Sequence, residues 1–365
     1  MSDSDESAIE QRLAEFIVPQ TDRPLGTGGT TFAVEPTETQ FKVAISCGFP
    51  IDSIRDEFAM HLNDALAPLQ LGRPVTLEFS WRVSAHAVQP GVKALPGIRN
   101  ILAIASGKGG VGKSTVTANM ALALARAGAR VGILDADVYG PSQPRILGLM
   151  GQRPETRDGK TLLPLSAQGI SVMSIGFLVE EGQAVAWRGP MVTSALNQML
   201  TQTDWGELDY LVVDMPPGTG DIQLTLAQKV PVSGAVIVTT PQNIALSDAR
   251  KGIDLFRKMS LPVLGVVENM AIHICDECGH EERLFGSGGG AVLAGEYGLP
   301  LLGSLPLQGS ISDQTDSGNP TVAADPDGAA ARLFRETALR IAGELAATGR
   351  DYSHLFPKVT VEAKA

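Results

Sequence analysis

The sequence is poor in cysteine, in aromatic side chains and in positive charge, and each shortage excludes a class of protein. Three cysteines in 365 residues are too few for the disulfide framework of a small secreted scaffold. Lysine and arginine number 29 against 40 acidic residues, and the formal net charge of −11 disfavours non-specific binding to nucleic acid or anionic membranes. No apolar run is long enough to cross a bilayer, and the acidic start MSDSDESAIE lacks the features of a secretory signal. We therefore expect a cytoplasmic protein with no nucleic-acid or membrane partner.

The composition that is present indicates a globular α/β fold. Hydrophobic residues make up 44% of the chain and glycines number 40, which suits a buried core with many tight turns. Helical segments at 113–127 and 245–259 lie between short apolar runs that look like strands buried on both faces. Together they predict a doubly wound, mostly parallel sheet with functional groups at the carboxyl ends of its strands. The strand candidates are residues 100–105, 130–135, 209–214, 234–239 and 263–268.

A change of pattern near residue 85 divides the chain. Before it, helical spacing occurs at 7–18 and 51–67, and strand-like alternation occurs at 40–46 and 74–82. Two Pro-Gly pairs then mark a linker. The predicted units are a small α/β domain at 1–84, a linker at 85–97, a P-loop domain at 98–350 and a C-terminal tail at 351–365.

A glycine-rich segment follows the first strand of the larger domain and opens its first helix. It matches the phosphate-binding pattern GxxxxGK(S/T) in the structural context that this pattern requires. Glycines let backbone N–H groups wrap phosphate oxygens, and the helix N-terminus adds free donors. Lys113 is expected to reach the β- and γ-phosphates of ATP, Ser114 to hold Mg²⁺ and Thr115 to contact the α-phosphate. The predicted nucleotide-binding residues of this segment are Gly107, Lys108, Gly109, Gly110, Val111, Gly112, Lys113, Ser114 and Thr115.

Acidic residues end two of the predicted strands. Asp135 ends one strand and is followed by Asp137, and Asp214 ends another. Carboxylates at the strand ends of such a sheet bind Mg²⁺ and orient an attacking water. Single aspartates at these positions are often turn caps, but three of them around one phosphate loop favour catalysis. The sequence thus predicts a P-loop ATPase with Mg²⁺ as cofactor.

The three cysteines are of two kinds. Cys47 stands alone in an apolar stretch and is interpreted as a core residue, whereas Cys275 and Cys278 form a CxxC pair flanked by His273 and His280. Two thiolates are half of the ligands of a 4Fe–4S cluster, so a symmetric dimer would complete the set. The same spacing also suits a zinc site, a thiol–disulfide motif or a pair of turn cysteines. From the residues alone these alternatives stay open.

Seven segments along residues 98 to about 340 resemble the Mrp/ApbC family of iron–sulfur cluster carrier ATPases, part of the deviant-Walker P-loop class. Residues 1–84 resemble the MIP18-type domain that precedes the ATPase in bacterial members. The resemblance implies a homodimer that binds a 4Fe–4S cluster at its interface and transfers it to apo-proteins, with slow ATP hydrolysis coupled to transfer. The segments are SGKGGVGKST (106–115), LDADVYGPSQP (134–144), WRGPM (187–191), DMPPGTGD (214–221), VENM (267–270), CDEC (275–278) and LFGSGGG (284–290).

The resemblance also assigns roles to single residues around the cluster and the dimer. Cys275 and Cys278 match the cluster-binding CxxC, although Asp276 stands where the family often has proline. Lys108 matches the signature lysine that reaches the partner's nucleotide across the dimer. No role is assigned to Arg188 of the WRGPM segment.

In the nucleotide site, the resemblance makes Asp135 and Asp214 members of the Mg²⁺ shell together with Ser114. Asp137 matches the residue that positions the attacking water, and Asn269 matches the residue that reads the adenine edge. The predicted catalytic residues are Lys108, Lys113 and Asp137.

Three other functions share the phosphate loop. A ParA/MinD-like positioning ATPase would be expected to have a basic DNA-binding surface or a C-terminal amphipathic membrane helix, and the tail DYSHLFPKVTVEAKA indicates neither. A reductase of the nitrogenase iron-protein kind would have its two cluster cysteines on separate segments. An ATP switch with a structural zinc site is distinguished by metal analysis.

Overall fold

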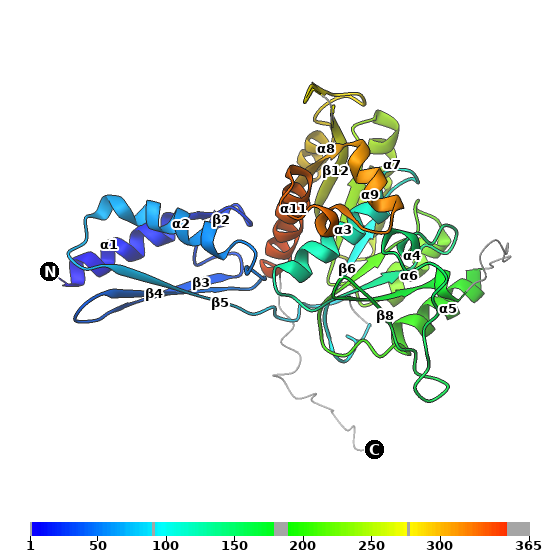
Figure 1. Ribbon diagram of the computed structural model, residues 1–365, viewed down its shortest axis with the longest axis horizontal. Coiled ribbons are helices and arrows are strands. Elements are labelled where there is room, and N and C mark those ends of the chain that lie inside the picture. The colour runs from blue at the N-terminus through cyan, green and yellow to red at the C-terminus, as the bar shows by residue number, and fades with distance from the viewer. Residues whose placement is uncertain (1, 90–91, 179–188, 276–277, 349–365) are drawn as a thin grey trace, which may run out of the picture.

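The computed structural model describes residues 2–89, 92–178, 189–275 and 278–348, which form a small N-terminal unit and a larger unit built on one sheet (Figure 1). The small unit consists of α1 (Ser2–Glu15), β1 (Ile17–Val18), β2 (Arg23–Pro24), β3 (Thr30–Pro36), β4 (Phe41–Cys47), α2 (Arg55–Leu66), η1 (Ala67–Leu69) and β5 (Val75–Trp81). The larger unit consists of β6 (Ile98–Ala105), α3 (Lys113–Arg126), β7 (Val131–Asp135), α4 (Gln143–Ile146), β8 (Leu165–Ala167), β9 (Ile170–Ser174), η2 (Ile175–Phe177), α5 (Gly189–Thr201), β10 (Leu208–Asp214), α6 (Asp221–Lys229), β11 (Gly234–Thr239), α7 (Asn243–Lys258), β12 (Val263–Ile274), β13 (Glu281–Glu282), α8 (Gly289–Tyr297), β14 (Leu301–Leu307), α9 (Gly309–Asp316), α10 (Thr321–Ala324) and α11 (Ala329–Ala346).

One sheet organises the larger unit. Its strands lie in the order β14-β12-β11-β6-β10-β7-β9-β8, and all neighbours from β14 to β9 are parallel. The short strands β8 and β13 are antiparallel to β9 and to the end of β12. The predicted doubly wound, mostly parallel α/β fold is therefore confirmed. β7, β10 and β11 are buried along their whole length, as expected for strands with helices on both faces.

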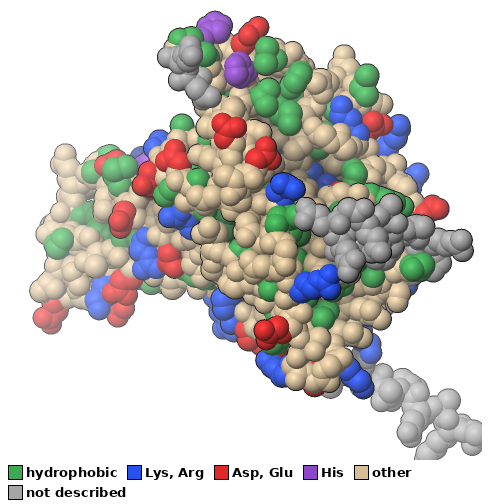
Figure 2. All heavy atoms as spheres, turned by 45° about the vertical axis from the view of Figure 1, so that its right-hand side comes forward, with side chains coloured by type: hydrophobic (Ala, Val, Ile, Leu, Met, Phe, Trp, Pro, Cys, Tyr) green, Lys and Arg blue, Asp and Glu red, His purple; other side chains and the backbone are tan. Residues whose placement is uncertain are grey.

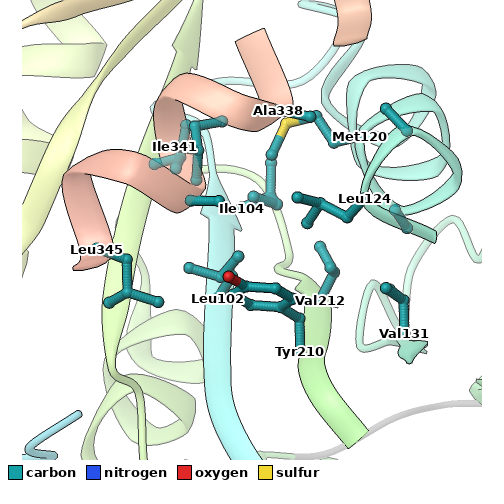
Figure 3. Packing of buried hydrophobic residues seen from close by; sticks show 14 of the residues in the cluster. Leu102, Ile104, Met120, Leu124, Val131, Tyr210, Val212, Ala338, Ile341 and Leu345 are labelled. Atoms are coloured by element: carbon teal, nitrogen blue, oxygen red, sulfur yellow. The ribbon is translucent and has the colours of Figure 1, made fainter. Parts of the chain in front are cut away.

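Different helices cover the two faces of this sheet. Figure 3 shows Met120 and Leu124 of α3 and Ile341 of α11 near Leu102 of β6 and Val212 of β10, all of them buried. On the opposite face, β7 and β10 lie against α5 and α6. Each such side chain contributes about 1.5–3 kcal/mol when it leaves water. This packing fixes the strand ends that carry the predicted site.

Three adjacent strands bring the predicted nucleotide residues to one edge of the sheet. β6 ends at Ala105, just before the glycine-rich loop, and its neighbour β10 ends at Asp214. The next strand, β7, ends at Asp135, and in the parallel register Asp135 is the direct partner of Asp214. The loop then leads into α3 at Lys113. Because parallel strands end at the same edge, residues far apart in sequence meet there.

The strand before the cysteine pair is longer than the sequence predicts. The apolar run indicated a strand at 263–268, but β12 continues to Ile274 by pairing with β14 and β13. Its second half is only partly buried, so the hydrophobic pattern does not reveal it. Cys275 consequently follows the strand directly.

The small unit is a three-stranded sheet in the order β3-β4-β5 with α1 and α2 on one face. Cys47 ends β4 and is buried, which confirms its interpretation as a core residue. Helix α1 ends at Glu15 rather than at residue 18, because Ile17 and Val18 form the short strand β1, which pairs with β2. Val18 also precedes Pro19, which disfavours a helical conformation there. Strand β3 was not predicted, since most of its residues are exposed or half-exposed and leave a weak hydrophobic pattern.

The two units contact each other near the C-terminal ends of α3 and α11. Arg23 Nη2 lies 2.9 Å from Glu344 Oε2 of α11. The backbone N–H of Asp52 donates to the carbonyl of Ala127, which follows α3, at 3.1 Å. The small unit thus packs at the far end of the helix that begins at the glycine-rich loop.

Part of the predicted linker at 85–97 lies along the larger unit. The buried Gln89 amide donates to the carbonyls of Ala227 and Val230, at 2.9 and 2.6 Å. The division of the chain at residues 84 and 98 stays a prediction, and the tail at 351–365 lies outside the described residues. Among the helices of the described residues, none has both the length and the apolar character that crossing a membrane needs.

Candidate functional site

The glycine-rich loop connects β6 to α3 with a backbone that only glycine adopts easily. Gly110 and Gly112 have φ values of +79° and +80°, in the left-handed region. A methyl group at Gly109 or Gly110 would meet nothing within 4 Å, so the loop leaves open space on its outer side. α3 begins at Lys113 without a side-chain cap, and its first N–H groups are available to a ligand. This geometry suits a phosphate group.

Gly107 is required for packing rather than for a turn. A methyl group there would lie 2.1 Å from the backbone carbon of Asp248 in α7. Val111 is buried beneath the loop, whereas Ser114 and Thr115 are half-buried in the first turn of α3. The predicted phosphate-binding residues therefore lie together around one helix N-terminus.

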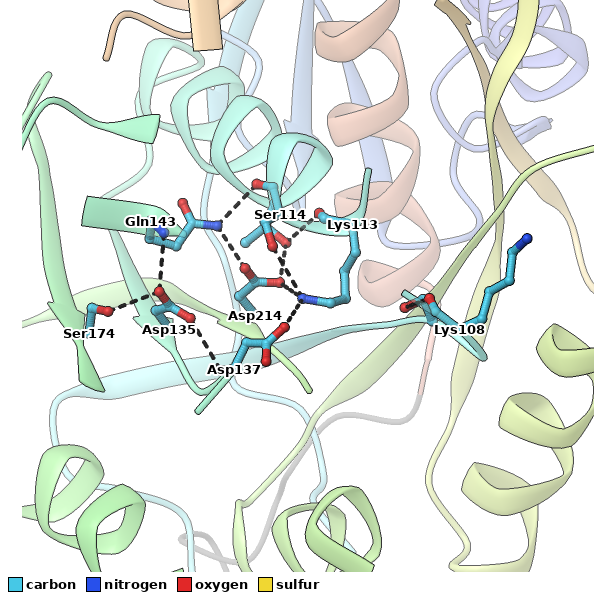
Figure 4. Close-up of polar contacts among 10 residues, drawn as sticks. Lys108, Lys113, Ser114, Asp135, Asp137, Gln143, Ser174 and Asp214 are labelled. Carbon is cyan, nitrogen blue, oxygen red and sulfur yellow. Dashed lines mark hydrogen bonds and ion pairs between the residues drawn. The ribbon is translucent and has the colours of Figure 1, made fainter. Parts of the chain in front are cut away.

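Lys113 is the centre of a buried ion cluster (Figure 4). Its amine forms a short contact with Asp214 Oδ1 and lies 3.7 Å from Asp137 Oδ2 and 3.3 Å from Ser114 Oγ. Asp135 lies beside Asp214, and the side chains of both aspartates are fully buried. The structure thus brings together Lys113, Ser114 and the three predicted aspartates.

Gln143 and Ser174 also belong to this ion cluster, although the sequence had not singled them out. The Gln143 side-chain amide donates to Asp214 Oδ2 at 2.8 Å and to the carbonyl of Ser114 at 3.0 Å. The Gln143 backbone N–H and the Ser174 hydroxyl donate to Asp135 Oδ2, at 3.1 and 2.9 Å. Gln143 lies within the LDADVYGPSQP segment, which could have indicated its place in the site. Ser174 lies in none of the family-like segments, so the sequence contains no indication of its role. Both residues hold the aspartates in fixed orientations.

Burial perturbs the acids of this cluster. Desolvation, together with the nearby charge of Asp214, raises the pKa of Asp135 to about 7. Desolvation also raises the pKa of Asp137, against the opposing charge of Lys113. Asp137 Oδ1 is buried without a hydrogen-bond partner. A cation would relieve both effects, and carboxylates with a hydroxyl are the oxygen ligands that Mg²⁺ prefers. The residues present therefore fit a Mg²⁺ ion.

Lys108 lies apart from the other lysine of the loop. In Figure 4 its side chain points away from Lys113 and the aspartates, and it is half-buried. Its own carbonyl accepts a hydrogen bond from the Ser106 hydroxyl at 2.9 Å. Within this chain Lys108 therefore does not contribute to the ion cluster around Lys113.

Asn269 connects β12 to the loop. Its side-chain amide donates to the carbonyl of Val111 at 2.8 Å. The preceding residue, Glu268, accepts a hydrogen bond from the N–H of Gly290 in α8 at 2.7 Å. The sequence placed Asn269 in the nucleotide site, and the structure places it against the phosphate loop itself.

The CxxC pair lies beyond β12, at the top of the molecule in Figure 1. Figure 2 shows this end as a projection that carries histidine and hydrophobic side chains. Cys275 is half-buried and Cys278 is exposed, and neither belongs to a disulfide. The Cys275 N–H donates to the carbonyl of His280, and the Gly279 N–H donates to the carbonyl of Cys275, at 3.0 and 2.8 Å. The end of β12 and the antiparallel strand β13 form a hairpin, and these bonds form a tight turn that brings the two cysteines to the end of this hairpin.

The flanking histidines do not form a metal site with the cysteines within one chain. His273 has its Nδ1 3.0 Å from the carbonyl oxygen of Leu307. In the part of the chain that the structure describes, no three His, Cys, Asp or Glu side chains form a group that could hold a metal ion. Asp276, Trp187 and Arg188 lie outside the described residues.

The fold and the loop define a P-loop nucleotide-binding protein. A family model described as the NUBPL iron-transfer P-loop NTPase, of the ParA group, matches residues 97–342. The chain is 59% identical over 279 residues to the iron–sulfur cluster carrier protein of Pseudomonas fragi, which covers 76% of this chain and 97% of that protein. It is 45% identical over 340 residues to the protein of the same name from Haemophilus influenzae, covering 93% and 92%.

A solved structure agrees with these relatives. The nucleotide-binding protein of Archaeoglobus fulgidus in complex with ADP, in which cobalt was found, has a TM-score of 0.55 and 41% sequence identity. The similarity covers 61% of this chain and 87% of that chain. The chain belongs to the iron-transfer P-loop NTPase family, as the resemblance to the Mrp/ApbC carriers implied.

Proposed function

We propose that this protein is an ATP-hydrolysing iron–sulfur cluster carrier, which holds a 4Fe–4S cluster between two copies of the chain and transfers it to apo-proteins. The relatives named as cluster carriers support this proposal over the positioning ATPase and the reductase. The observation that carries it is the path of β12. This one strand contacts the phosphate loop at Asn269 and ends one residue before Cys275. A nucleotide site and a pair of metal-binding thiols are thereby joined by a few residues of backbone.

ATP binding requires a rearrangement of the ion cluster. Lys113, paired here with Asp214, exchanges this carboxylate for the β- and γ-phosphates. Backbone N–H groups of the loop and of the first turn of α3 hold the phosphate oxygens. Ser114, Asp135 and Asp214 would hold a Mg²⁺ ion, which would supply positive charge against the phosphate oxygens. The buried ion cluster around Lys113 is therefore assembled before ATP arrives, and Lys113 only exchanges Asp214 for the phosphates.

Hydrolysis needs a water in line with the γ-phosphorus. Asp137, with one carboxylate oxygen unpaired, accepts a hydrogen bond from this water and orients it. The water oxygen bonds to the γ-phosphorus as the bond from this phosphorus to the leaving oxygen of ADP breaks. One proton of the water stays on the phosphate that forms, and the other passes through Asp137 to solvent. Lys108, which points away from its own ion cluster, reaches the nucleotide of the second copy.

The 4Fe–4S cluster is the cargo that the protein delivers, and the cysteine site suits a ligand that must be released. Cys275 and Cys278 supply two thiolates from each copy, so two copies provide the four that a 4Fe–4S cluster takes. Cys278 is exposed and Cys275 is half-buried, so the thiolates of an acceptor can replace them one at a time, beginning at Cys278. This exchange changes ligands only, so it needs no oxidant or reductant.

The test is anaerobic reconstitution with ferrous iron and sulfide, followed by iron, sulfide and zinc analysis and by mass measurement of the assembly. We expect a dimer with equal amounts of iron and sulfide. Cys275→Ser and Cys278→Ser should each lose this iron, while Cys47→Ala, which changes the buried cysteine of the small unit, keeps it. A monomer without iron would refute the carrier function, and zinc without sulfide would support an ATP switch with a structural metal. Coupling is tested by transfer to an apo-acceptor, where equal rates with and without Mg-ATP would contradict it.

A further inference from the structure

The junction between the two halves of β12 contains surplus residues. Along β14, Glu268 pairs with Ser304 and Ile272 pairs with Pro306. Four steps on β12 therefore match two steps on β14, and two residues of β12 are in excess. Residues 269–271, which we name the β12 bulge, contain this excess. Bulges of this kind occur beside active sites, where they redirect the strand.

The β12 bulge contains a residue in an unfavourable conformation. Met270 has φ +56°, in the left-handed region, although it has a long side chain and lies within a strand. This conformation is disfavoured for residues other than glycine. Strained residues of this kind persist only where their surroundings hold them in place.

The phosphate loop holds the β12 bulge. Asn269 donates to the carbonyl of Val111 at 2.8 Å. A methyl group at Gly112 would lie 2.3 Å from the Asn269 amide nitrogen and 3.5 Å from the Met270 methyl carbon. Gly112 directly precedes Lys113 in the chain. The strained residue is therefore packed against the loop beside the lysine that must change partner when phosphate binds.

Both sides of the β12 bulge are firmly bonded. On the sheet side, Glu268 accepts the N–H of Gly290 at 2.7 Å. On the cysteine side, His273 Nδ1 lies 3.0 Å from the carbonyl of Leu307, and Cys275 is closed into its turn. Leu307 ends β14, which pairs with both halves of β12, so the bulge is a joint between the first half of β12 and a second half that carries the cysteines.

We infer that the β12 bulge transmits nucleotide occupancy from the phosphate loop to Cys275 and Cys278; this inference rests on the proposed function. When phosphate draws Lys113 away from its carboxylate, the loop shifts at Gly112 and the support of the bulge is lost. The left-handed residue then relaxes, and the hairpin moves outward. Two surplus residues contain about 6–7 Å of strand length, which is the largest displacement available. A shift of two residues also keeps every side chain on its original face of the strand.

The experiment makes the left-handed conformation of residue 270 more favourable in one variant and less favourable in another. Met270→Gly removes the penalty of the left-handed conformation, and Met270→Ile, which is β-branched, increases it. The cost of the left-handed conformation for a residue other than glycine corresponds to about a five- to thirtyfold shift in the equilibrium between the strained and the relaxed bulge. The matched control is Ser260→Gly, because Ser260 also has φ +56° but lies in an exposed turn at the other end of β12.

Two readouts are compared in the full-length protein. One is the ratio of cluster-transfer rates with and without Mg-ATP after anaerobic loading. The other is alkylation of Cys275 and Cys278 by iodoacetamide in cluster-free protein, with and without Mg-ATP. Cys47 does not interfere, because burial raises the pKa of its thiol to about 12.

We expect Met270→Gly to reduce the effect of Mg-ATP on both readouts by about five- to thirtyfold. We expect Met270→Ile to react and to release its cluster quickly even without nucleotide, and Ser260→Gly to behave as the unchanged protein. Equal responses in all four proteins would refute the inference while leaving the carrier function intact. If the unchanged protein takes up no iron, the carrier function fails, and the alkylation rates still decide whether the bulge responds to nucleotide.

Discussion

The phosphate loop and the cysteine turn lie at two ends of one strand segment, yet they are built in opposite ways. Around the loop, Lys113, Asp135 and Asp214 are buried, and each has at least one charged or hydrogen-bonding partner. At the other end, Cys275 is half-buried and Cys278 is exposed. The first site is held by side chains from three strands and two helices, whereas the second is held by a few backbone bonds.

The difference follows from what each site must do. A site that stabilises charge on a phosphate works best when its dipoles and charges are already oriented in a dry environment. A site that releases its ligand to another protein must expose its thiolates to the incoming ones. We therefore expect substitutions at the loop to have large effects on catalysis and stability, and substitutions at the cysteines to affect cargo alone.

The largest expected effect is on catalysis. Among the described residues, Lys113 is the cation that lies beside both Asp214 and Asp137. Lys113→Ala removes it, and we expect ATP hydrolysis to fall by about 10²–10³-fold. Phosphate release measures this, with the exposed Lys160→Ala as control. Iron loading should persist in both variants. Hydrolysis that stays within tenfold of the unchanged protein would show that the two sites differ less than their burial indicates.

The second effect is on the pH dependence of stability. Burial raises the pKa of Asp135 to about 7, whereas in the unfolded chain it is near 3.9. Between these values only the unfolded state loses the proton, so the free energy of unfolding falls as pH rises from about 4 to 7. Asp135→Asn should remove roughly 2–4 kcal/mol of this decline in nucleotide-free protein.

Denaturant unfolding at several pH values measures this effect. The variant and the unchanged protein should have similar stabilities near pH 4, where the carboxyl is protonated in both states. Above pH 7 the variant should be the more stable protein. Parallel curves over the whole range would mean that Asp135 is ionised in the folded state.

The smallest expected effect is on stability, where one substitution in each region allows a direct comparison. Gln143→Ala leaves Asp214 Oδ2 and the Ser114 carbonyl without this buried donor, and we expect a loss of about 1–3 kcal/mol in the free energy of unfolding. Cys278→Ser changes an exposed side chain and should stay within about 0.5 kcal/mol. Urea titration of nucleotide-free protein compares them. Equal losses of unfolding free energy in the two variants would contradict the contrast between the buried phosphate-loop site and the exposed cysteine turn.

Much of the nucleotide site could be predicted from the sequence because its residues are close to strand ends. Asp135 and Asp214 follow apolar runs, and parallel strands end at one edge, so their proximity followed from the pattern. Gln143 escaped prediction because its role depends on a side-chain amide that joins Asp214, at the end of β10, to the Ser114 carbonyl in α3. The partner of Asn269 was also beyond reach, since Val111 lies 158 residues away in the sequence.

The course of β12 shows the same limit. Its buried half has a clear hydrophobic pattern, but the second half is held by β13 and β14 and has none. The left-handed Met270 has no sequence signal, because methionine carries no preference for that conformation.

The sequence by itself determined the fold class, the phosphate loop and the family, because these rest on local patterns: apolar periodicity, glycine spacing and residues at strand ends. The tertiary structure alone decided which partners Lys113 and Asn269 have, and that one strand joins the loop to the cysteines. Such contacts arise from the packing of segments far apart in the chain, and no local pattern records them. The bulge that connects the two sites exists only because the register between β12 and β14 shifts by two residues.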